Sequence, residues 1–341
     1  MHVVFDPRQI EHAPDRELHN GEWAAYAEVP ARAEAIAALL DCHPARDFGM
    51  APIEAVHAPD YLQFLQDAWA DWQQTGRGGD AIPYTFPVRR RRALSLDRID
   101  ARLGRYAFDA ATPISENTWK SAYWSAQTAL TAVEDLLSGE QSTAFALCRP
   151  PGHHSGHDYM GGYCYLNSAA IAAKHAHSSG LSRVAVLDVD YHHGNGTQDI
   201  FYESADVFFA SIHADPATDY PFYWGHADER GAGEGQGTTL NVPLPRGTQW
   251  NVYREALAGV VEKLIDWQPE LLVVSFGADT FAGDPISHFK LRTEDYREMA
   301  QLISTIEVPT LVVMEGGYAI ADLGANTASF LAGMGVPASV T

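Results

Sequence analysis

The side chains best suited to binding a metal ion are concentrated in the segment Asp188-Val-Asp-Tyr-His-His-Gly-Asn-Gly196, which follows a run of apolar residues. If this run is a β-strand, alternate side chains share a face, so Asp188, Asp190 and His192 point the same way. Two carboxylates and an imidazole are costly to bury together unless a cation compensates them. The Asp-x-His pattern suits zinc, whereas the alternative interpretation is a hydrogen-bonded polar turn.

A second apolar run supplies one more carboxylate. The stretch Leu271-Leu-Val-Val-Ser-Phe-Gly-Ala278 leads directly into Asp279. Because ligands of open α/β sheets bind beyond the carboxyl ends of the strands, Asp279 is a candidate third ligand beside Asp190 and His192. Three protein ligands leave a position for water, which is typical of catalytic rather than structural zinc. The alternative is an ordinary helix-capping aspartate.

Two adjacent histidines, His153 and His154, follow a third apolar run in the segment Arg149-Pro-Pro-Gly-His-His. The prolines restrict the backbone, so we expect the two rings to be held rather than mobile. We interpret them as acid–base groups, with metal ligation as the rival role. Their roles would depend on their partners, because an aspartate keeps a histidine charged whereas an asparagine shifts its pKa less. Asp188 and Asn195 are available as these partners.

A fourth apolar run leads into Glu315-Gly-Gly-Tyr318. The double glycine permits unusual backbone dihedrals and close backbone approach. It could place the Tyr318 hydroxyl above the metal, where it would donate a hydrogen bond to a developing oxyanion. The alternative is an ordinary turn followed by a packed tyrosine.

The four segments must be positioned by the apolar runs that precede them, which alternate with helical stretches. The predicted strands are Val3–Phe5, Ala144–Cys148, Val184–Asp190, Val207–His213, Leu271–Gly277 and Thr310–Met314. The predicted helices are Ala31–Leu40, Pro59–Trp72, Ser115–Leu137, Asn167–Ser178, Thr248–Trp267 and Thr293–Ile306. Nearly continuous apolar strands are covered on both faces. We therefore expect a single α/β domain over residues 1–341, with a mostly parallel central β-sheet flanked by helices.

One segment, residues 75–112, does not follow this alternation and contains four consecutive arginines, Arg89–Arg92. An insertion of this length in a compact domain is usually functional or at an interface. The arginines are consistent with an ion-paired loop or with a subunit contact. A nucleic-acid patch is disfavoured because the run is short and lacks interleaved aromatic residues.

The composition limits the class of protein. The chain carries 23 basic and 44 acidic residues, a formal net charge of −21, so we expect no nucleic-acid partner. Three cysteines without CxxC spacing argue against disulfides and against a cysteine-based zinc site. No apolar run approaches the roughly 18 residues of a membrane span. Because the first residues also lack the pattern of a secretion signal, we expect a cytoplasmic protein without a membrane partner.

Taken in order, the four polar segments resemble the histone deacetylase superfamily within the arginase–deacetylase fold. The matching residues are Arg149-Pro-Pro-Gly-His-His154, Asp188-Val-Asp-Tyr-His-His-Gly-Asn-Gly196, Gly277-Ala-Asp-Thr280 and Glu315-Gly-Gly-Tyr318. The resemblance implies one zinc ion per subunit, bound by Asp190, His192 and Asp279.

The resemblance also implies the roles of the acid–base residues. His154 would be the general base and then the general acid. His153, paired with Asp188, would be its electrostatic partner, and Tyr318 would polarise the amide carbonyl. Structural K⁺ or Na⁺ ions are implied beneath the zinc. One ion would bind at Asp188, Asp190, His192, Ser211 and Ile212. A second would bind at Phe201, Ser204 and Val207, with Asn241 as a further candidate.

Within the superfamily, the chain resembles bacterial acetylpolyamine amidohydrolases over nearly its whole length. This resemblance includes Phe86-Pro-Val-Arg-Arg90, Gly161-Gly-Tyr-Cys164, Thr197-Gln-Asp-Ile-Phe-Tyr202 and Asp284-Pro-Ile-Ser287. It implies a homodimer formed through the insert, which would also narrow the active-site tunnel. Gly162, Tyr163 and Tyr220 would line that tunnel and its rim. One insert carboxylate expected at the distal ammonium is replaced by Ala111, whereas Asp100 would preserve the other.

The expected activity is removal of the acetyl group from a small acetylated amine, such as acetylputrescine or acetylcadaverine, by attack of zinc-activated water. The alternatives are deacetylation of acetyl-lysine or another small amide, an arginase-like hydrolysis of guanidino groups, and a non-catalytic binding protein with an inherited pocket. The last alternative is disfavoured because the expected ligands, His154 and Tyr318 are all present.

Overall fold

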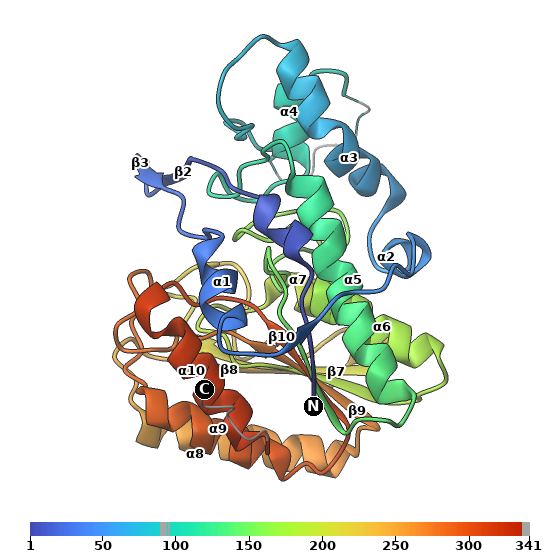
Figure 1. Cartoon of the computed structure of the whole chain (residues 1–341), viewed down its shortest axis with the longest axis vertical. Coiled ribbons are helices and arrows are strands. Elements are labelled where there is room, and N and C mark those ends of the chain that lie inside the picture. Colours follow the sequence, from blue (N-terminus) through green and yellow to red (C-terminus); the bar gives the residue numbers. More distant parts are fainter. Residues whose placement is uncertain (89–93, 95, 336–341) are drawn as a thin grey trace.

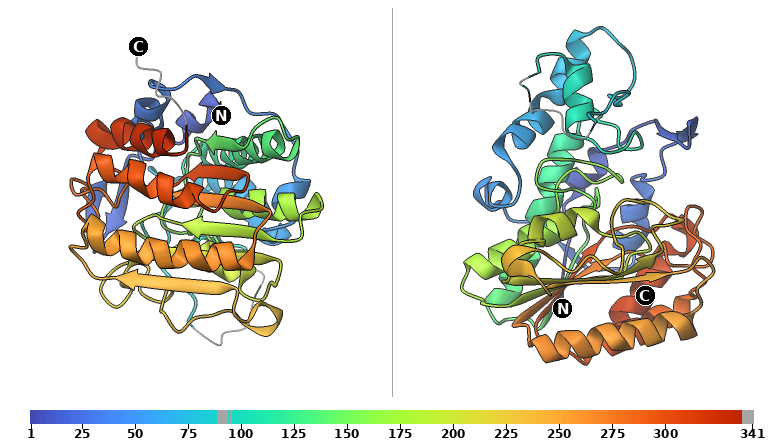
Figure 2. Two further views of the ribbon diagram at one scale, coloured as in Figure 1. Left: turned by 90° about the horizontal axis from the view of Figure 1, so that it is seen from below. Right: turned by 180° about the vertical axis from the view of Figure 1, so that it is seen from behind.

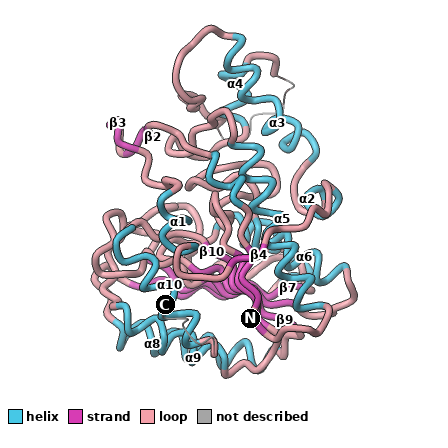
Figure 3. The backbone as a smooth tube through the Cα atoms, in the orientation of Figure 1, coloured by secondary structure: helices cyan, strands magenta, loops and turns pink. Residues whose placement is uncertain are grey.

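Eight parallel strands form the central sheet of the structure, a computed structural model that describes residues 1–88, 94 and 96–335 (Figure 1). Their spatial order is β4-β1-β5-β10-β9-β6-β7-β8. The strands are β1 (His2–Val4), β4 (Cys42–His43), β5 (Thr143–Ala146), β6 (Val184–Asp188), β7 (Val207–Ala214), β8 (Thr239–Leu244), β9 (Leu271–Phe276) and β10 (Thr310–Met314). A separate antiparallel hairpin, β2 (Arg16–His19) and β3 (Glu22–Ala25), projects from the body (Figures 1 and 3).

Helices cover both faces of this sheet, as Figure 2 shows from two sides. The helices are α1 (Ala31–Ala37), α2 (Ala51–Glu54), α3 (Pro59–Gln74), α4 (Ile99–Arg105), α5 (Thr118–Leu137), α6 (Ser168–Ser178), α7 (Asn195–Phe201), α8 (Trp250–Trp267), α9 (Thr293–Ser304) and α10 (Ile320–Gly333), with short 3-10 helices at Pro7–Glu11 and Gly233–Gly235. Helices α5 and α6 pack against one face, and α8, α9 and α10 pack against the other.

Alternation along the central strands divides the core into two layers. Val273 of β9 belongs to the cluster beneath α5 and α6, whereas its neighbours Leu272 and Val274 belong to the cluster beneath α8, α9 and α10. Every residue of β6, β7, β9 and β10 is buried. A strand whose two faces are both covered needs apolar side chains at successive positions, which explains why these runs are almost continuously apolar.

The predicted α/β class and all six predicted strands are confirmed, and the sheet is parallel throughout. One boundary was wrong in a way that affects the site. The strand predicted over Val184–Asp190 ends at Asp188, and residues 189–193 continue as a loop. Simple alternation therefore does not apply to Asp190 and His192.

Several elements were absent from the sequence-based prediction. They are β4, β8, the hairpin β2–β3, and helices α2, α4, α7 and α10. Strand β8 is only partly buried at the sheet edge and contains Pro243, so it lacks the continuous apolar pattern of the central strands. The hairpin is largely exposed, with Glu17 and Leu18 as its more buried positions, and therefore gives little hydrophobic signal.

The described residues of the insert at 75–112 lie beside α3, at the end of the molecule farthest from α8 and α9 (Figure 1). These described residues include helix α4, whose Arg102 pairs with Asp71 of α3. Arg77 and Arg98 both pair with Asp100. The arginine run at positions 89–92 lies outside the described residues.

The fold brings the four polar segments to one edge of the sheet. They follow β5, β6, β9 and β10, which are adjacent in the order β5-β10-β9-β6. The strand ends are nearly level, because Asp188 pairs with Ser275 and Phe276 pairs with Met314. Parallel strands present their carboxyl ends at the same edge, so residues up to 170 positions apart converge there.

Among the described residues, none of the helices combines the length and apolar character needed to cross a lipid bilayer.

Candidate active site

Three possible metal ligands converge beyond the carboxyl ends of β6 and β9. One donor atom from each of Asp190, His192 and Asp279 lies within 4.8 Å of the others. His192 Nδ1 is 3.0 Å from Asp279 Oδ2 and 3.3 Å from Asp190 Oδ1. The backbone N–H of Gly316 donates to Asp190 Oδ2 at 2.8 Å, and a Cβ atom at Gly277 would lie only 1.9 Å from that oxygen. The glycines therefore provide the space that the Asp190 carboxylate occupies.

The donor set fits a divalent cation. Burial raises the pKa of Asp279 to about 7, and the nearby Asp190 carboxylate adds to this effect. Burial opposes the charged form of His192, but Asp190 and Asp279 outweigh it and raise its pKa to about 10. Without a cation, the group thus binds protons to reduce repulsion between buried carboxylates. A metal ion would stabilise the deprotonated carboxylates and the neutral imidazole, and two oxygens with one nitrogen suit zinc.

The paired histidines occupy different electrostatic environments. His153 Nδ1 is 2.9 Å from Asp188 Oδ2, whereas His154 Nδ1 is 2.7 Å from Asn195 Oδ1. Burial opposes the charged form of His153, but Asp188 and Asp190 outweigh it and raise its pKa to about 10. Burial, reinforced by the positive charges of His153 and His192, lowers the pKa of His154 well below its ordinary value. His153 is therefore an imidazolium, and His154 is a neutral base.

Glu315 fixes the loop that carries both histidines. Its Oε2 accepts hydrogen bonds from the backbone N–H groups of Gly152 at 2.6 Å and His153 at 3.1 Å. Its Oε1 accepts from the Ser275 hydroxyl at 3.2 Å. The fully buried carboxylate thus ties the loop after β5 to the ends of β9 and β10. This contact explains why a glutamate begins the Glu315-Gly-Gly-Tyr318 segment.

Tyr318 faces the same space from the loop after β10. Its backbone N–H donates to Asp284 Oδ2 at 2.7 Å, and its ring lies 5.7 Å from that of Tyr163. Burial raises the pKa of Tyr318 well above its ordinary value. The hydroxyl therefore keeps its proton at neutral pH and can donate a hydrogen bond.

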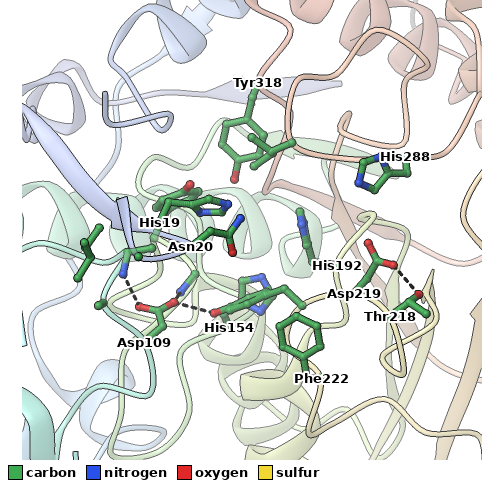
Figure 4. Close-up of a pocket in the computed structure, with 18 of the residues that line it drawn as sticks. His19, Asn20, Asp109, His154, His192, Thr218, Asp219, Phe222, His288 and Tyr318 are labelled. Atoms are coloured by element: carbon green, nitrogen blue, oxygen red, sulfur yellow. Dashed lines mark hydrogen bonds between the residues drawn. The ribbon is translucent and has the colours of Figure 1, made fainter. Parts of the chain in front are cut away.

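A pocket of about 440 Å³ joins these groups (Figure 4). His154, His192 and Tyr318 all line it. Other lining residues come from the β2–β3 hairpin, the insert and four further loops. They are Leu18, His19, Asn20, Gly21, Asp109, Ala110, Ala111, Gly162, Tyr163, Thr218, Asp219, Tyr220, Phe222, Arg246, Ile286 and His288. A base, a candidate metal site and a hydroxyl donor thus share one cavity, as hydrolysis of a polarised carbonyl requires.

Comparison with known protein families agrees with this arrangement. The family of the histone deacetylase domain matches residues 24–334, which include all four polar segments. The chain belongs to the histone deacetylase family. It is accordingly a deacetylase-type amidohydrolase, and its family is generally zinc-dependent.

Individual relatives in the histone deacetylase family match nearly the entire chain. Acetylpolyamine amidohydrolase 2 of Pseudomonas aeruginosa is 46% identical, and the match covers 97% of each chain. Acetylpolyamine amidohydrolase of Mycoplana ramosa is 45% identical over 98% of this chain and 99% of the relative. The crystal structure of the acetylpolyamine aminohydrolase from Burkholderia pseudomallei superimposes with a TM-score of 0.94 at 41% identity, covering 98% and 99% of the two chains.

The tunnel residues expected from the family resemblance lie in the pocket. Gly162, Tyr163 and Tyr220 all line it. Gly162 has a φ of +54°, and a Cβ atom there would lie 2.1 Å from the His154 ring, so glycine is needed on both counts. Tyr220 stands edge-on to the His154 ring, with centroids 5.2 Å apart.

The insert carboxylates are arranged differently from the expectation. Asp100 lies outside the pocket lining, and its carboxylate pairs with Arg77 at 2.5 Å and Arg98 at 2.8 Å. Ala111 does line the pocket, but Asp109, two residues earlier, places a carboxylate there. Asp109 Oδ2 accepts hydrogen bonds from the Gly162 backbone N–H at 2.7 Å and the Tyr220 hydroxyl at 2.8 Å. Sequence reasoning missed Asp109 because only the folded insert turns it towards the cavity.

The residues predicted to bind monovalent cations lie on β6, α7, β7 and β8 and in the loops that follow β6 and α7. Asp188 is paired in register with Ser211, whose hydroxyl lies 2.8 Å from His213 Nδ1. Phe201 and Ser204 form a turn in which the Ser204 N–H donates to the Phe201 carbonyl at 2.9 Å. The proposed ligands Ile212 and Val207 lie on β7, and Asn241 lies on β8 beside His193. Cation binding at these places remains a prediction.

Proposed function

We propose that the protein is a zinc-dependent amidohydrolase that removes acetyl groups from small acetylated polyamines. The observation that carries the proposal is the convergence of His154, Tyr318 and the Asp190–His192–Asp279 group on one pocket with carboxylates in its wall. A zinc ion bound by that group would act as a Lewis acid towards the amide carbonyl and lower the pKa of water towards about 7.

The chain's own residues support the proton transfers of hydrolysis. His154 is neutral, and its Nδ1 faces Asn195, so its Nε2 is available to accept a proton from water. As the hydroxide attacks the acetyl carbon, the Tyr318 hydroxyl donates a hydrogen bond to the developing oxyanion. When the C–N bond breaks, His154 returns the proton to the amine nitrogen. The products are acetate and a free amine.

His153 supports these steps without touching the substrate. Its positive charge is held by Asp188 and lies next to His154, since the two ring centroids are 4.1 Å apart. A fixed positive charge stabilises negative charge that develops in the transition state. It also disfavours early protonation of His154, which must begin the reaction as a base.

The pocket favours a slender, cationic substrate. Tyr163 and Tyr220 supply flat apolar walls for an alkyl chain. Asp109 and Asp219 both line the pocket, as Figure 4 shows, and the Asp219 carboxylate is paired with Arg246 at 2.7 Å. Asp109 therefore compensates for the alanine at position 111. The names of the full-length relatives point to the same class of substrate.

We also propose that the protein forms a homodimer through the insert. The insert exposes large apolar side chains at Tyr84, Phe86, Val88 and Leu94. Apolar residues gathered on one protruding segment are typical of an interface. Asp100 lies on the same segment and would act on a substrate only if the partner's pocket were nearby. Light scattering after size-exclusion chromatography tests the dimer, and a monomer at micromolar concentration would contradict it.

One panel of substrates tests the reaction and its specificity together. Amine release is measured from acetylputrescine, acetylcadaverine, acetylspermidine and an acetyl-lysine peptide, each with and without a chelator. We expect chelator-sensitive cleavage that favours the small polyamines. Preference for the peptide would contradict the polyamine assignment while leaving the chemistry intact. Absence of cleavage by verified zinc-loaded protein would contradict the proposed deacetylation of amines.

A further inference from the structure

The general base works only in one of its two neutral forms. A neutral imidazole carries its hydrogen on Nδ1 or on Nε2, and only the Nδ1–H form leaves Nε2 free to accept a proton from water. Burial, followed in importance by the charge of His153, lowers the pKa of His154 well below its ordinary value. Because the His154 ring is neutral, a neighbouring group must select the tautomer.

Asn195 lies against His154 Nδ1, but an amide by itself does not make this selection. Its Oδ1 is 2.7 Å from His154 Nδ1, so in this orientation the ring donates to the amide. If the amide were rotated by 180°, its NH₂ group would donate to Nδ1 and place the hydrogen on Nε2. The group that orients the Asn195 amide therefore decides whether His154 can act as a base.

Tyr159 provides the acceptor that orients this amide. Asn195 Nδ2 donates to the Tyr159 hydroxyl oxygen at 3.3 Å, and its other contact is the His154 carbonyl oxygen at 3.4 Å. The Tyr159 hydroxyl donates in turn to Asp199 Oδ2 at 2.6 Å. An ionised carboxylate can only accept hydrogen bonds, so every hydrogen bond from His154 to Asp199 has a fixed direction.

The position of Tyr159 is built into the fold. A Cβ atom at Gly156 would lie 2.3 Å from the Tyr159 ring, so the ring occupies space that only glycine leaves open. Phe108 packs edge-on against the ring, with centroids 5.6 Å apart. On the other side, Trp224 Nε1 donates to Asp199 Oδ1 at 3.1 Å. Although Asp199 is exposed overall, partial desolvation of its carboxyl raises its pKa to about 6, and it is ionised at neutral pH.

We propose that Tyr159 is a positioning residue for the general base: its hydroxyl, held by Asp199, orients the Asn195 amide and thereby keeps His154 in the Nδ1–H tautomer. The kinetic consequence rests on the amide hydrolysis proposed above. The tautomer itself is a property of the chain and can be measured whichever amide is cleaved.

The direct test is the nitrogen NMR spectrum of zinc-loaded protein labelled with ¹⁵N-histidine, with His154 assigned by comparison with the His154→Gln variant. The two ring nitrogens have distinct shifts when protonated and unprotonated. We expect protonated Nδ1 and unprotonated Nε2 in the unmodified protein, and a measurable shift towards the other tautomer in Tyr159→Phe. A well-folded Tyr159→Phe protein with unchanged His154 shifts would overturn the proposal. If that variant does not fold, Asp199→Ala is measured instead, with the same two outcomes.

The kinetic test separates a positioning role from a general loss of stability. Removing one hydrogen bond of ordinary strength should lower kcat about five- to tenfold in Tyr159→Phe, with little change in KM. Asp199→Ala should lower kcat as well, but should add nothing to Tyr159→Phe because the two act through one hydroxyl. Additive losses would contradict the proposal.

The matched control is Tyr123→Phe. This variant removes the same atom from a second tyrosine–aspartate pair. Tyr123 lies on α5, outside the pocket lining, and its hydroxyl donates to Asp47 Oδ1 at 2.5 Å. We expect wild-type kcat and unchanged His154 shifts in this variant. If Tyr123→Phe changed both as strongly as Tyr159→Phe, the effect would not be specific to the chain of hydrogen bonds that reaches His154.

Discussion

The guanidinium of Arg32 lies over the ring of Tyr318, 4.7 Å from its centre. Its Nε donates to the Gly317 carbonyl and its Nη2 donates to the Glu315 carbonyl, each at 2.6 Å. Glu28 balances its charge through a contact of 2.7 Å. A planar group with several fixed donors can hold two carbonyls and an aromatic face together. Arg32 therefore fixes the loop that presents the Tyr318 hydroxyl to the pocket.

Replacing Arg32 with lysine tests this role. Lysine keeps the positive charge beside Glu28 but cannot bridge two carbonyl groups and cover the Tyr318 ring. We expect kcat to fall roughly tenfold and the free energy of unfolding to fall by about 1 to 3 kcal/mol, measured by substrate turnover and urea unfolding. Arg46→Lys is the control, because Arg46 pairs with Asp135 on the exposed surface. Wild-type turnover in Arg32→Lys would contradict the assignment.

Removing the Tyr318 hydroxyl should affect turnover much more than substrate binding. Tyr318→Phe keeps the ring but loses the donor to the developing oxyanion, so kcat should fall by roughly 10² to 10³. The zinc content should not change, because Tyr318 is outside the Asp190–His192–Asp279 group. Steady-state kinetics and elemental analysis measure the two quantities. Near-normal turnover would remove Tyr318 from the mechanism.

Loss of one ligand should abolish stoichiometric metal binding. Asp190→Ala removes a buried oxygen donor from the group of three, and we expect far less than one zinc per chain after dialysis. Plasma mass spectrometry gives the zinc content directly. Asp47→Ala is the control, since Asp47 accepts hydrogen bonds from the Tyr123 hydroxyl and the Gly49 N–H, away from the ligand group. Full zinc retention in Asp190→Ala would show that the ligands are elsewhere.

Asp109 should contribute to substrate selection through its charge. Burial raises the pKa of the Asp109 carboxyl, and the hydrogen bonds that it accepts from Gly162 and Tyr220 oppose this rise. Asp109→Asn keeps the shape and an acceptor for the Gly162 N–H but removes the group that can carry a negative charge in the pocket wall. We expect kcat/KM to fall about tenfold for acetylputrescine and to change little for the neutral N-butylacetamide, since an ammonium loses roughly 1 to 2 kcal/mol of attraction. Equal losses for both substrates would indicate that Asp109 only supports the loop.

His57 should make the stability of the protein depend on pH. It is fully buried, with Nδ1 2.9 Å from the Gly156 carbonyl and Nε2 3.0 Å from the Asn167 backbone nitrogen. Burial lowers its pKa to about 3. Since the unfolded histidine has a pKa of about 6.5, the unfolded state binds more protons between these values. The contribution of His57 is therefore complete above about pH 6.5 and decreases as the pH falls towards 3.

Urea unfolding of the wild-type and His57→Gln proteins from pH 7 to pH 5 measures this contribution. Other buried histidines also contribute, so the relevant quantity is the difference between the two pH dependences. The slope should be smaller in His57→Gln by up to about 1.4 kcal/mol per pH unit. His43→Gln, which changes an exposed histidine, should retain the wild-type slope. Identical slopes in His57→Gln and wild type would mean that folding does not lower the pKa of His57.

The central strands could be predicted from the sequence because their burial restricts which side chains they can carry. A strand that is covered on both faces must be apolar at consecutive positions, as Val184–Asp188 and Leu271–Phe276 are. The edge strand Thr239–Leu244 and the exposed hairpin lack this requirement and were missed. The misplaced end of β6 has a similar cause. Hydrogen bonding from the Asp190 N–H to Asp188 Oδ1, which no hydrophobic pattern reports, ends the extended backbone there.

By itself, the sequence determined the α/β class, the family and the polar segments that meet at one edge of the sheet, because strand ends and their polar residues are local features of the chain. Only the tertiary structure decided that Arg32 supports Tyr318, that Asp109 rather than Asp100 faces the pocket, and that Tyr159 and Asp199 extend the hydrogen bonding of His154. These relationships join segments that pack together only after folding. Since a buried polar group must find its partner in space rather than along the chain, its partner cannot be read from spacing alone.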